Sequence, residues 1–307
     1  MLTRIAEDAE RALRAVEAAP ELLRAEAVSE AQALLRELLG QDFDVDDVGV
    51  PRLHRGTRSG RIVSVHDPEM RPGRKSESQR FDGYKLHAAA TNTEQPLICA
   101  VEVEPASDRD GPQAKALVDR QPAERRPTRL LGDTAYGDTL TREDMEERDV
   151  ELLAPVPTPN AGKVFGKERF TVDLEGGTVR CPAGHVQPVP ATADRRGQRG
   201  VQFPRTVCGP CPLHSRCTTS ERRKLTLARR EDLLLAARLA LENPANSEHL
   251  RRTRPRIERP LGLLVHRYGA RKSRYLGKRK ATLQAAFAAA LVNLNPIGTA
   301  LRARTAS

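Results

Sequence analysis

The sequence contains no tryptophan, and aromatic residues make up only 3% of its 307 residues. We therefore do not expect stacking of bases on aromatic side chains to dominate any contact with nucleic acid. Long apolar runs are also missing: no stretch approaches the length needed to cross a membrane, and the N-terminus has no signal-peptide core. These absences predict a cytoplasmic protein without membrane contact.

Cysteine is scarce and odd in number, with five residues in a chain that carries no export signal. This argues against a disulfide framework. Four of the five fall within one segment and include a Cys-x2-Cys pair: Cys181, Cys208, Cys211 and Cys217. The set is compatible with a structural tetrahedral zinc site, for which His185 and His214 are spare ligands. The alternative is that these cysteines are small buried side chains of a compact subdomain.

Basic residues are in excess, with 51 Lys and Arg against 41 Asp and Glu, a net charge of +10 and a pI near 9.7. Such a balance suits a polyanionic partner. The excess is concentrated between residues 251 and 280, where apolar residues at helical spacing predict a basic helix face. The alternative is a solvated face without a partner. The residues that we expect to contact double-stranded DNA are Arg251, Arg254, Arg256, Arg271, Lys272 and Arg274.

Hydrophobic patterning divides the chain into four parts. Residues 1–60 read as a helical segment, which Gly40 ends, followed by a linker. Residues 61–154 predict short strands at 62–65, 84–89, 97–101 and 151–154, a strand ending at Asp133, and helices at 112–121 and 140–148. Residues 155–225, rich in Pro and Gly, predict an inserted Cys-rich subdomain. Residues 226–307 predict a helical part with the basic face.

The order strand, strand, strand, helix, strand, helix is that of a ribonuclease-H-like core, whose active site lies at strand ends. We therefore expect an α/β fold: a mixed sheet with flanking helices and the inserted subdomain.

Two carboxylates stand out against this pattern. Asp133 ends an apolar run, and Glu258 lies in an arginine-rich segment. An acid at the end of a strand and an acid among cations suit a Mg²⁺ (or Mn²⁺) site that faces a phosphate backbone, because Mg²⁺ prefers one or two carboxylates together with water and phosphate oxygens. Paired metal ions hold the attacking and leaving oxygens of an in-line displacement.

Several short sequence motifs, in this order, resemble those of DDE transposases of bacterial insertion sequences. They are Asp67–Arg71, Asp82–His87, Gly132–Gly137, Cys181–His185, Cys208–Leu213 and Arg271–Gly277. The resemblance covers roughly residues 60–296. It implies a ribonuclease-H-like fold, three catalytic acids with Mg²⁺, cleavage and joining of DNA strands, and homo-oligomers that act on paired ends. Asp133 matches the second acid of the family and Glu258 the third.

The chain departs from the family at two points. Around the third acid many relatives carry Tyr-x2-Arg-x3-Glu-x6-Lys; Arg254 and Glu258 keep their spacing, whereas Arg251 and Val265 replace the tyrosine and the lysine. The first acid, which relatives carry upstream in an Asp-Ser/Gly-Thr/Ser phrase, has no counterpart before residue 60. Asp67, after an apolar stretch, is the substitute that the sequence offers.

Because the motif with the first acid is missing, three interpretations of this protein remain open. The chain is a DDE transposase that is truncated at its N-terminus and that we expect to cut DNA poorly or not at all, an inactive remnant that only binds DNA, or a zinc-ribbon nucleic-acid-binding protein.

Overall fold

The computed structural model describes residues 2–56, 58–76, 78–158 and 164–305. The chain forms two compact units. The first comprises Met1–His87, Val101–Asp108 and Leu263–Ser307, and the second comprises Ala88–Ala100 and Arg109–Gly262. The boundary between them therefore falls within two neighbouring strands. The fold is α/β and ribonuclease-H-like in the order of its elements, as predicted.

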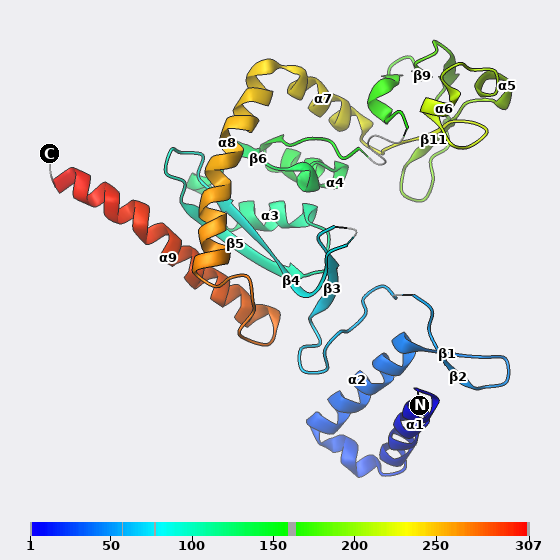
Figure 1. Cartoon of the computed structure of the whole chain (residues 1–307), viewed down its shortest axis with the longest axis vertical. Coiled ribbons are helices and arrows are strands. Elements are labelled where there is room, and N and C mark those ends of the chain that lie inside the picture. The colour runs from blue at the N-terminus through cyan, green and yellow to red at the C-terminus, as the bar shows by residue number, and fades with distance from the viewer. Residues whose placement is uncertain (1, 57, 77, 159–163, 306–307) are drawn as a thin grey trace. The chain divides into compact units, whose positions relative to one another are not determined.

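The first unit begins with two packed helices (Figure 1). Its N-terminal elements are α1 (Leu2–Glu17), the 3-10 helix η1 (Pro20–Arg24), α2 (Glu26–Asp42) and the antiparallel strands β1 (Phe43–Val45) and β2 (Pro51–Leu53). The predicted helical segment is confirmed. Helix α2 continues to Asp42, two residues past the stop that Gly40 predicts, and the N–H of Phe43 still donates to the carbonyl of Leu39.

The predicted strand at 62–65 is wrong. Ile62 is buried as an apolar strand residue would be, but its backbone is satisfied by a side chain. Gln41 donates from Nε2 to the carbonyl of Ile62 and accepts from the N–H of Ile62, each across 2.9 Å. The segment has the sequence of a strand, but this amide takes the place of a strand neighbour.

A three-stranded sheet in the order β3-β4-β5 follows. Its strands are β3 (Arg71–Arg74), β4 (Arg80–Ala90) and β5 (Ile98–Pro105). Strands β3 and β4 are antiparallel, and β4 also pairs with β5; these two strands contain the predicted segments 84–89 and 97–101. Strand β5 contributes Val101 and Val103 to the core.

The second unit continues the predicted order of elements. After the sheet come α3 (Gly111–Asp119), η2 (Ala123–Arg125), β6 (Arg129–Leu131), η3 (Thr134–Tyr136), α4 (Thr139–Glu146) and β7 (Glu151–Leu153). Strands β6 and β7 form a parallel pair in which Leu130 lies opposite Leu152. Ala114, Val118, Met145 and Val150 form the core beneath them. A parallel pair with helical crossovers places the carboxyl ends of both strands at one edge.

Residues 164–227 fold around a hydrophobic cluster of their own. The elements of this Cys-rich lobe are η4 (Lys167–Arg169), β8 (Thr171–Asp173), β9 (Thr178–Arg180), β10 (Val186–Pro188), β11 (Arg199–Gln202), α5 (Arg205–Cys208), α6 (His214–Cys217) and β12 (Lys224–Leu227). They make a sheet in the order β10-β9-β8 and an antiparallel pair of β11 with β12.

The C-terminal third is helical. Its elements are α7 (Glu231–Glu242), α8 (Pro244–Gly262), the π-helix η5 (Leu263–Arg267) and α9 (Lys278–Thr305). Helix α8 begins at Pro244, and Figure 1 shows the bend where α7 gives way to α8. Among the described residues, no helix is both long and apolar enough to span a membrane.

Candidate functional site

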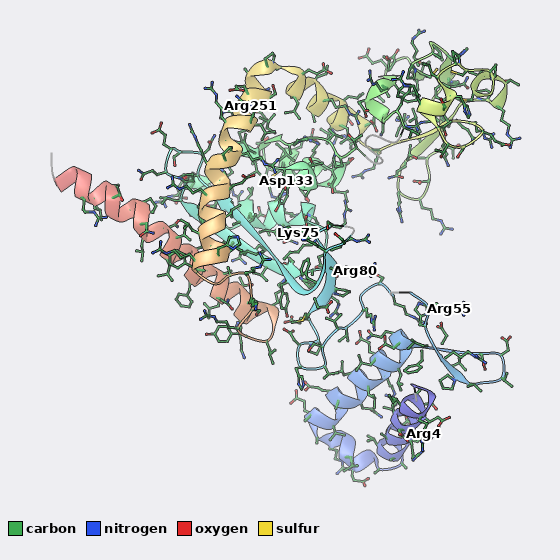
Figure 2. All side chains as sticks on the ribbon, in the orientation of Figure 1. Arg4, Arg55, Lys75, Arg80, Asp133 and Arg251 are labelled. Carbon is green, nitrogen blue, oxygen red and sulfur yellow. The ribbon has the colours of Figure 1, made fainter. Side chains whose placement is uncertain are left out.

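Asp133 lies just beyond the end of β6, on the turn that η3 makes (Figure 2). The N–H of Gly132 donates to the carbonyl of Leu153 across 3.1 Å, which extends the pairing with β7 up to the residue before the acid. Oδ1 of Asp133 then caps η3 by accepting from the N–H of Ala135 across 2.9 Å. The side chain is exposed, so the carboxylate is offered to solvent from a fixed backbone.

The turn after Asp133 is fixed by close contacts with the backbone at Pro155 and by the side chain of Arg142. A Cβ at Gly137 would lie 1.8 Å from the carbonyl oxygen of Pro155, so only glycine fits at this position. The buried guanidinium of Arg142 donates to the carbonyls of Gly137 (3.1 Å), Leu152 (3.2 Å) and Ala154 (2.6 Å). Burial lowers the pKa of Arg142. This one side chain therefore ties the end of β7 to the turn that carries Asp133.

Tyr136 lies in the same turn between two acids. Burial raises the pKa of its hydroxyl, and the charges of Asp110 and Asp133 add to the rise. Asp110 precedes α3, so α3 and the end of β6 bring two carboxylates near one phenol.

Glu258 lies on α8, on the exposed side of the helix. Nε of Arg254, one turn earlier, donates to Oε1 of Glu258 across 2.8 Å. This hydrogen bond raises the pKa of Arg254, and the charge of Asp133 contributes in the same direction. Two acids that are far apart in sequence thus act on one guanidinium within the second unit.

Helix α8 is basic and largely exposed from residue 251 to 259, and its buried described residues are Thr253 and Pro260. The predicted DNA contacts Arg251, Arg254 and Arg256 all lie on this exposed surface. Glu248 partly neutralises it: Arg251 donates two hydrogen bonds to its carboxylate (2.8 and 2.9 Å), and Arg252 donates another. These arginines lower the pKa of Glu248 to about 2, so the carboxylate is ionised at any working pH.

The other predicted DNA contacts, Arg271, Lys272 and Arg274, lie in the first unit, on the loop between η5 and α9. Gln284 of α9 fixes this loop by donating to the carbonyls of Gly269 (3.0 Å) and Lys272 (2.9 Å). It also accepts from the N–H of Arg274 across 2.9 Å.

A cleft of about 810 Å³ separates this loop from the β3–β4 hairpin. Its cationic lining residues are Lys75, Arg80, Lys85, Arg271 and Lys272, against one acid, Asp82, among the described residues that line it. The hairpin cations, of which Figure 2 labels Lys75 and Arg80, were not predicted. The only feature of the sequence that could have predicted them is the presence of cations in a segment that otherwise reads as a strand.

Asp67 lies in the first unit and is buried, with 1% of its surface exposed. Oδ1 accepts from the hydroxyl of Tyr84 across 2.7 Å, and Oδ2 accepts from the N–H of Gly277 across 3.0 Å. Glu69 accepts from the N–H of Lys278 across 2.7 Å. Both acids therefore bond the first backbone donors of α9, where the helix dipole favours negative charge.

The four cysteines of the Cys-rich lobe line one small cavity of about 20 Å³, together with His185 and His214. The fifth, Cys99, lies elsewhere, exposed on β5. Among the described residues, no group of three or more His, Cys, Asp or Glu side chains stands ready to hold a metal ion.

Three contributions to the site escaped the sequence analysis. Arg142 stands in a polar helical stretch that reads as exposed, and Asp110 reads as a turn residue. The hairpin cations Lys75 and Arg80 are separated in sequence from the basic segment that they face across the cleft.

Comparison with known families gives one match: residues 180–297 match a model described as a transposase DDE domain. No curated protein and no solved structure matches the chain. The matched segment contains Glu258, the four cysteines of the lobe and the basic residues of α8 and the following loop. Asp133 precedes it, at the end of β6. The match supports a DDE-type transposase, a family that acts on DNA and generally uses a divalent metal ion such as Mg²⁺.

Proposed function

We propose that this protein cleaves and joins DNA strands at the ends of an insertion sequence, in a Mg²⁺- or Mn²⁺-dependent reaction in which Asp133 and Glu258 hold the metal. The observation that carries the proposal is the position of the two exposed acids in the second unit: Asp133 follows the end of β6, and Glu258 lies on the basic helix α8. The charges of both acids also act on Arg254.

The donor atoms suit a magnesium site that relies on water and substrate for its other ligands. Asp133 uses Oδ1 for the cap and Glu258 uses Oε1 for Arg254, while in the described part of the chain neither Oδ2 nor Oε2 takes part in a hydrogen bond. Two carboxylates with one open oxygen each are a donor set that Mg²⁺ accepts together with phosphate oxygens. When bound, the metal supplies positive charge to the attacking and leaving oxygens.

The chain's own residues position the DNA. The exposed arginines of α8 attract the phosphate backbone next to Glu258, and Arg142 keeps the turn of Asp133 from shifting. Arg254 would have two tasks: it bonds Glu258 in the free protein, and it would turn to a phosphate of bound DNA. Guanidinium suits this second task because it binds phosphate oxygens in pairs.

Asp67 is a poor third acid, because both of its oxygens already bond the protein. Asp110 is the better choice within the second unit, because it directly precedes α3 and because its charge, like that of Asp133, acts on the hydroxyl of Tyr136. We propose that Asp110 contributes the third carboxylate to the reaction. In the assembled protein, homo-oligomers would hold two DNA ends together.

The test is a nicking assay on supercoiled plasmid that carries the DNA flanking this gene, with Mg²⁺ or Mn²⁺. Asp133→Asn and Glu258→Gln should lower nicking by at least 100-fold while DNA binding survives, and Asp110→Asn should lower it strongly. Glu242→Gln is the matched control, because Glu242 is exposed at the end of α7, away from the catalytic acids in sequence. Nicking that persists in Asp133→Asn and Glu258→Gln would disprove the proposal.

The second candidate function is DNA binding without cleavage, which the exposed basic helix α8 favours on its own. It predicts salt-dependent DNA binding and no nicking with either metal in the unaltered chain. The third reading, a zinc-ribbon protein, instead requires DNA binding to depend on the Cys-rich lobe. Retained binding in variants of the cysteines would count against it.

A further inference from the structure

The four cysteines of the Cys-rich lobe lie around one cavity. Cys181 and Cys217 are 36 positions apart in the sequence, yet these two and the Cys208–Cys211 pair line the same cavity of about 20 Å³. Four cysteines from three separate segments are therefore close neighbours.

The backbone around these cysteines forms tight turns. The N–H of Cys181 donates to the carbonyl of His185 across 2.8 Å, and the N–H of Gly184 donates to the carbonyl of Cys181 across 2.9 Å. Gly184 has φ of +89°, a conformation that favours glycine, so the turn depends on this residue. In the second pair, the N–H of Cys211 donates to the carbonyl of Cys208 across 3.2 Å. Both turns belong to segments that line the cavity.

Arg223 supplies the charge that thiolates need. Its N–H donates to Sγ of Cys208 at 3.5 Å, and its guanidinium donates to the carbonyls of Cys217 and Phe165, each across 2.8 Å. Nε of this guanidinium is buried without a hydrogen-bond partner among the described residues. A cation at this position offsets negative charge on sulfur.

The lobe has little else to stabilise it. Its own core consists of seven buried residues, of which Cys208 is one: Phe170, Val179, Val201, Phe203, Cys208, Leu225 and Leu227. Cys181 and Cys217 pack against this core. Small folds with a core of this size usually need a disulfide or a metal ion. All the cysteines are free thiols, which leaves the metal ion.

We propose that Cys181, Cys208, Cys211 and Cys217 bind one structural Zn²⁺ ion that stabilises the Cys-rich lobe. Four thiolates in tetrahedral arrangement are a closed zinc site without an open position for chemistry. The sulfurs do not yet stand at metal-binding distances, so binding must draw them in around the cavity. Each thiol gives up its proton to solvent as it binds, and Arg223 offsets part of the double negative charge that results.

The test measures zinc in the purified full-length chain by elemental analysis, together with release of zinc to a chromogenic chelator. One zinc per chain is expected. Cys208→Ser and Cys211→Ser should each lose most of the zinc, and Cys99→Ser, the matched control on β5, should keep all of it. Less than about one tenth of a zinc per chain in the unaltered protein, after growth and purification with added zinc, would overturn the proposal.

Replacement of zinc by Co²⁺ separates the four-cysteine site from one that uses histidine. Four thiolates give strong sulfur-to-cobalt charge-transfer absorption and tetrahedral d–d bands. These bands should be unchanged in His185→Ala and His214→Ala. A loss of metal in either histidine variant, with metal retained in Cys181→Ser or Cys217→Ser, would overturn the proposed ligand set even where a cysteine variant folds poorly.

The proposed zinc site does not depend on the cleavage reaction, because zinc content is read without DNA. Failure of the nicking assay would leave it standing.

Discussion

Arg254 donates a hydrogen bond from Nε to Oε1 of Glu258 across 2.8 Å, one turn along α8. Both side chains are largely exposed, 72% and 59%, so the pair adds little to stability. Its consequence is electrostatic. The same guanidinium feels the charge of Asp133, so a single cation lies under the influence of two acids that we propose as metal ligands.

Arg254→Ala should therefore bind divalent metal more tightly. Removing the cation leaves the two carboxylates without their neutralising partner, and we expect apparent Mn²⁺ affinity, measured by calorimetry, to rise about threefold to tenfold. Nicking should fall, because the phosphate loses a donor. Arg252→Ala is the control, since Arg252 pairs with Glu248 instead. An equal rise in affinity for both variants would mean that only net charge matters.

The sequence predicted the order of elements well, because alternating and helical apolar patterns persist from β4 to β7. It failed at residues 62–65 because the partner of Ile62 is the Gln41 side chain, and pairing of that kind leaves no periodic signal. Arg142 was missed for a related reason. A lone arginine in a polar helix reads as exposed, and only the folded chain places three carbonyls around its guanidinium.

Glu248→Gln should strengthen DNA binding. Glu248 holds Arg251 and Arg252, and these arginines keep its pKa near 2, so its negative charge is always present. The amide would release both guanidiniums to phosphates. We expect affinity at low salt to rise several-fold, and the slope of log affinity against log salt to steepen by roughly one to two.

Fluorescence anisotropy on one duplex over a series of salt concentrations measures both quantities. Glu242→Gln removes the same charge from the neighbouring helix α7 and serves as the control. If it steepens the slope as much as Glu248→Gln, then α8 is not the surface that meets the phosphates.

Arg142→Met should destabilise the protein strongly. The substitution keeps much of the side-chain volume but leaves the carbonyls of Gly137, Leu152 and Ala154 without their donor, and each buried unpaired acceptor costs about 1–3 kcal/mol. We expect a loss of about 3 kcal/mol or more, measured by urea unfolding.

Arg129→Met is the comparison for that experiment, because Arg129 pairs with Glu151 across the same two strands while both side chains are half exposed. Its cost should stay below about 1 kcal/mol. Similar losses in the two variants would show that the buried bonds of Arg142 contribute no more than a surface pair.

The remaining prediction separates a structural from a catalytic Asp67. Its oxygens accept from Tyr84 and from Gly277 at the start of α9, so Asp67→Asn keeps one acceptor and loses the other. The expected cost is about 1–2 kcal/mol of stability, as for other helix caps. Tyr84→Phe, which removes the other hydrogen bond, should cost a similar amount.

Both variants should keep metal-dependent nicking per folded molecule, whereas Asp133→Asn should keep stability and lose nicking. Unfolding curves and nicking rates, measured on the same preparations, decide between the roles. Full stability with lost nicking in Asp67→Asn would make Asp67 a metal ligand after all, since a cap cannot be removed from α9 without weakening the first unit.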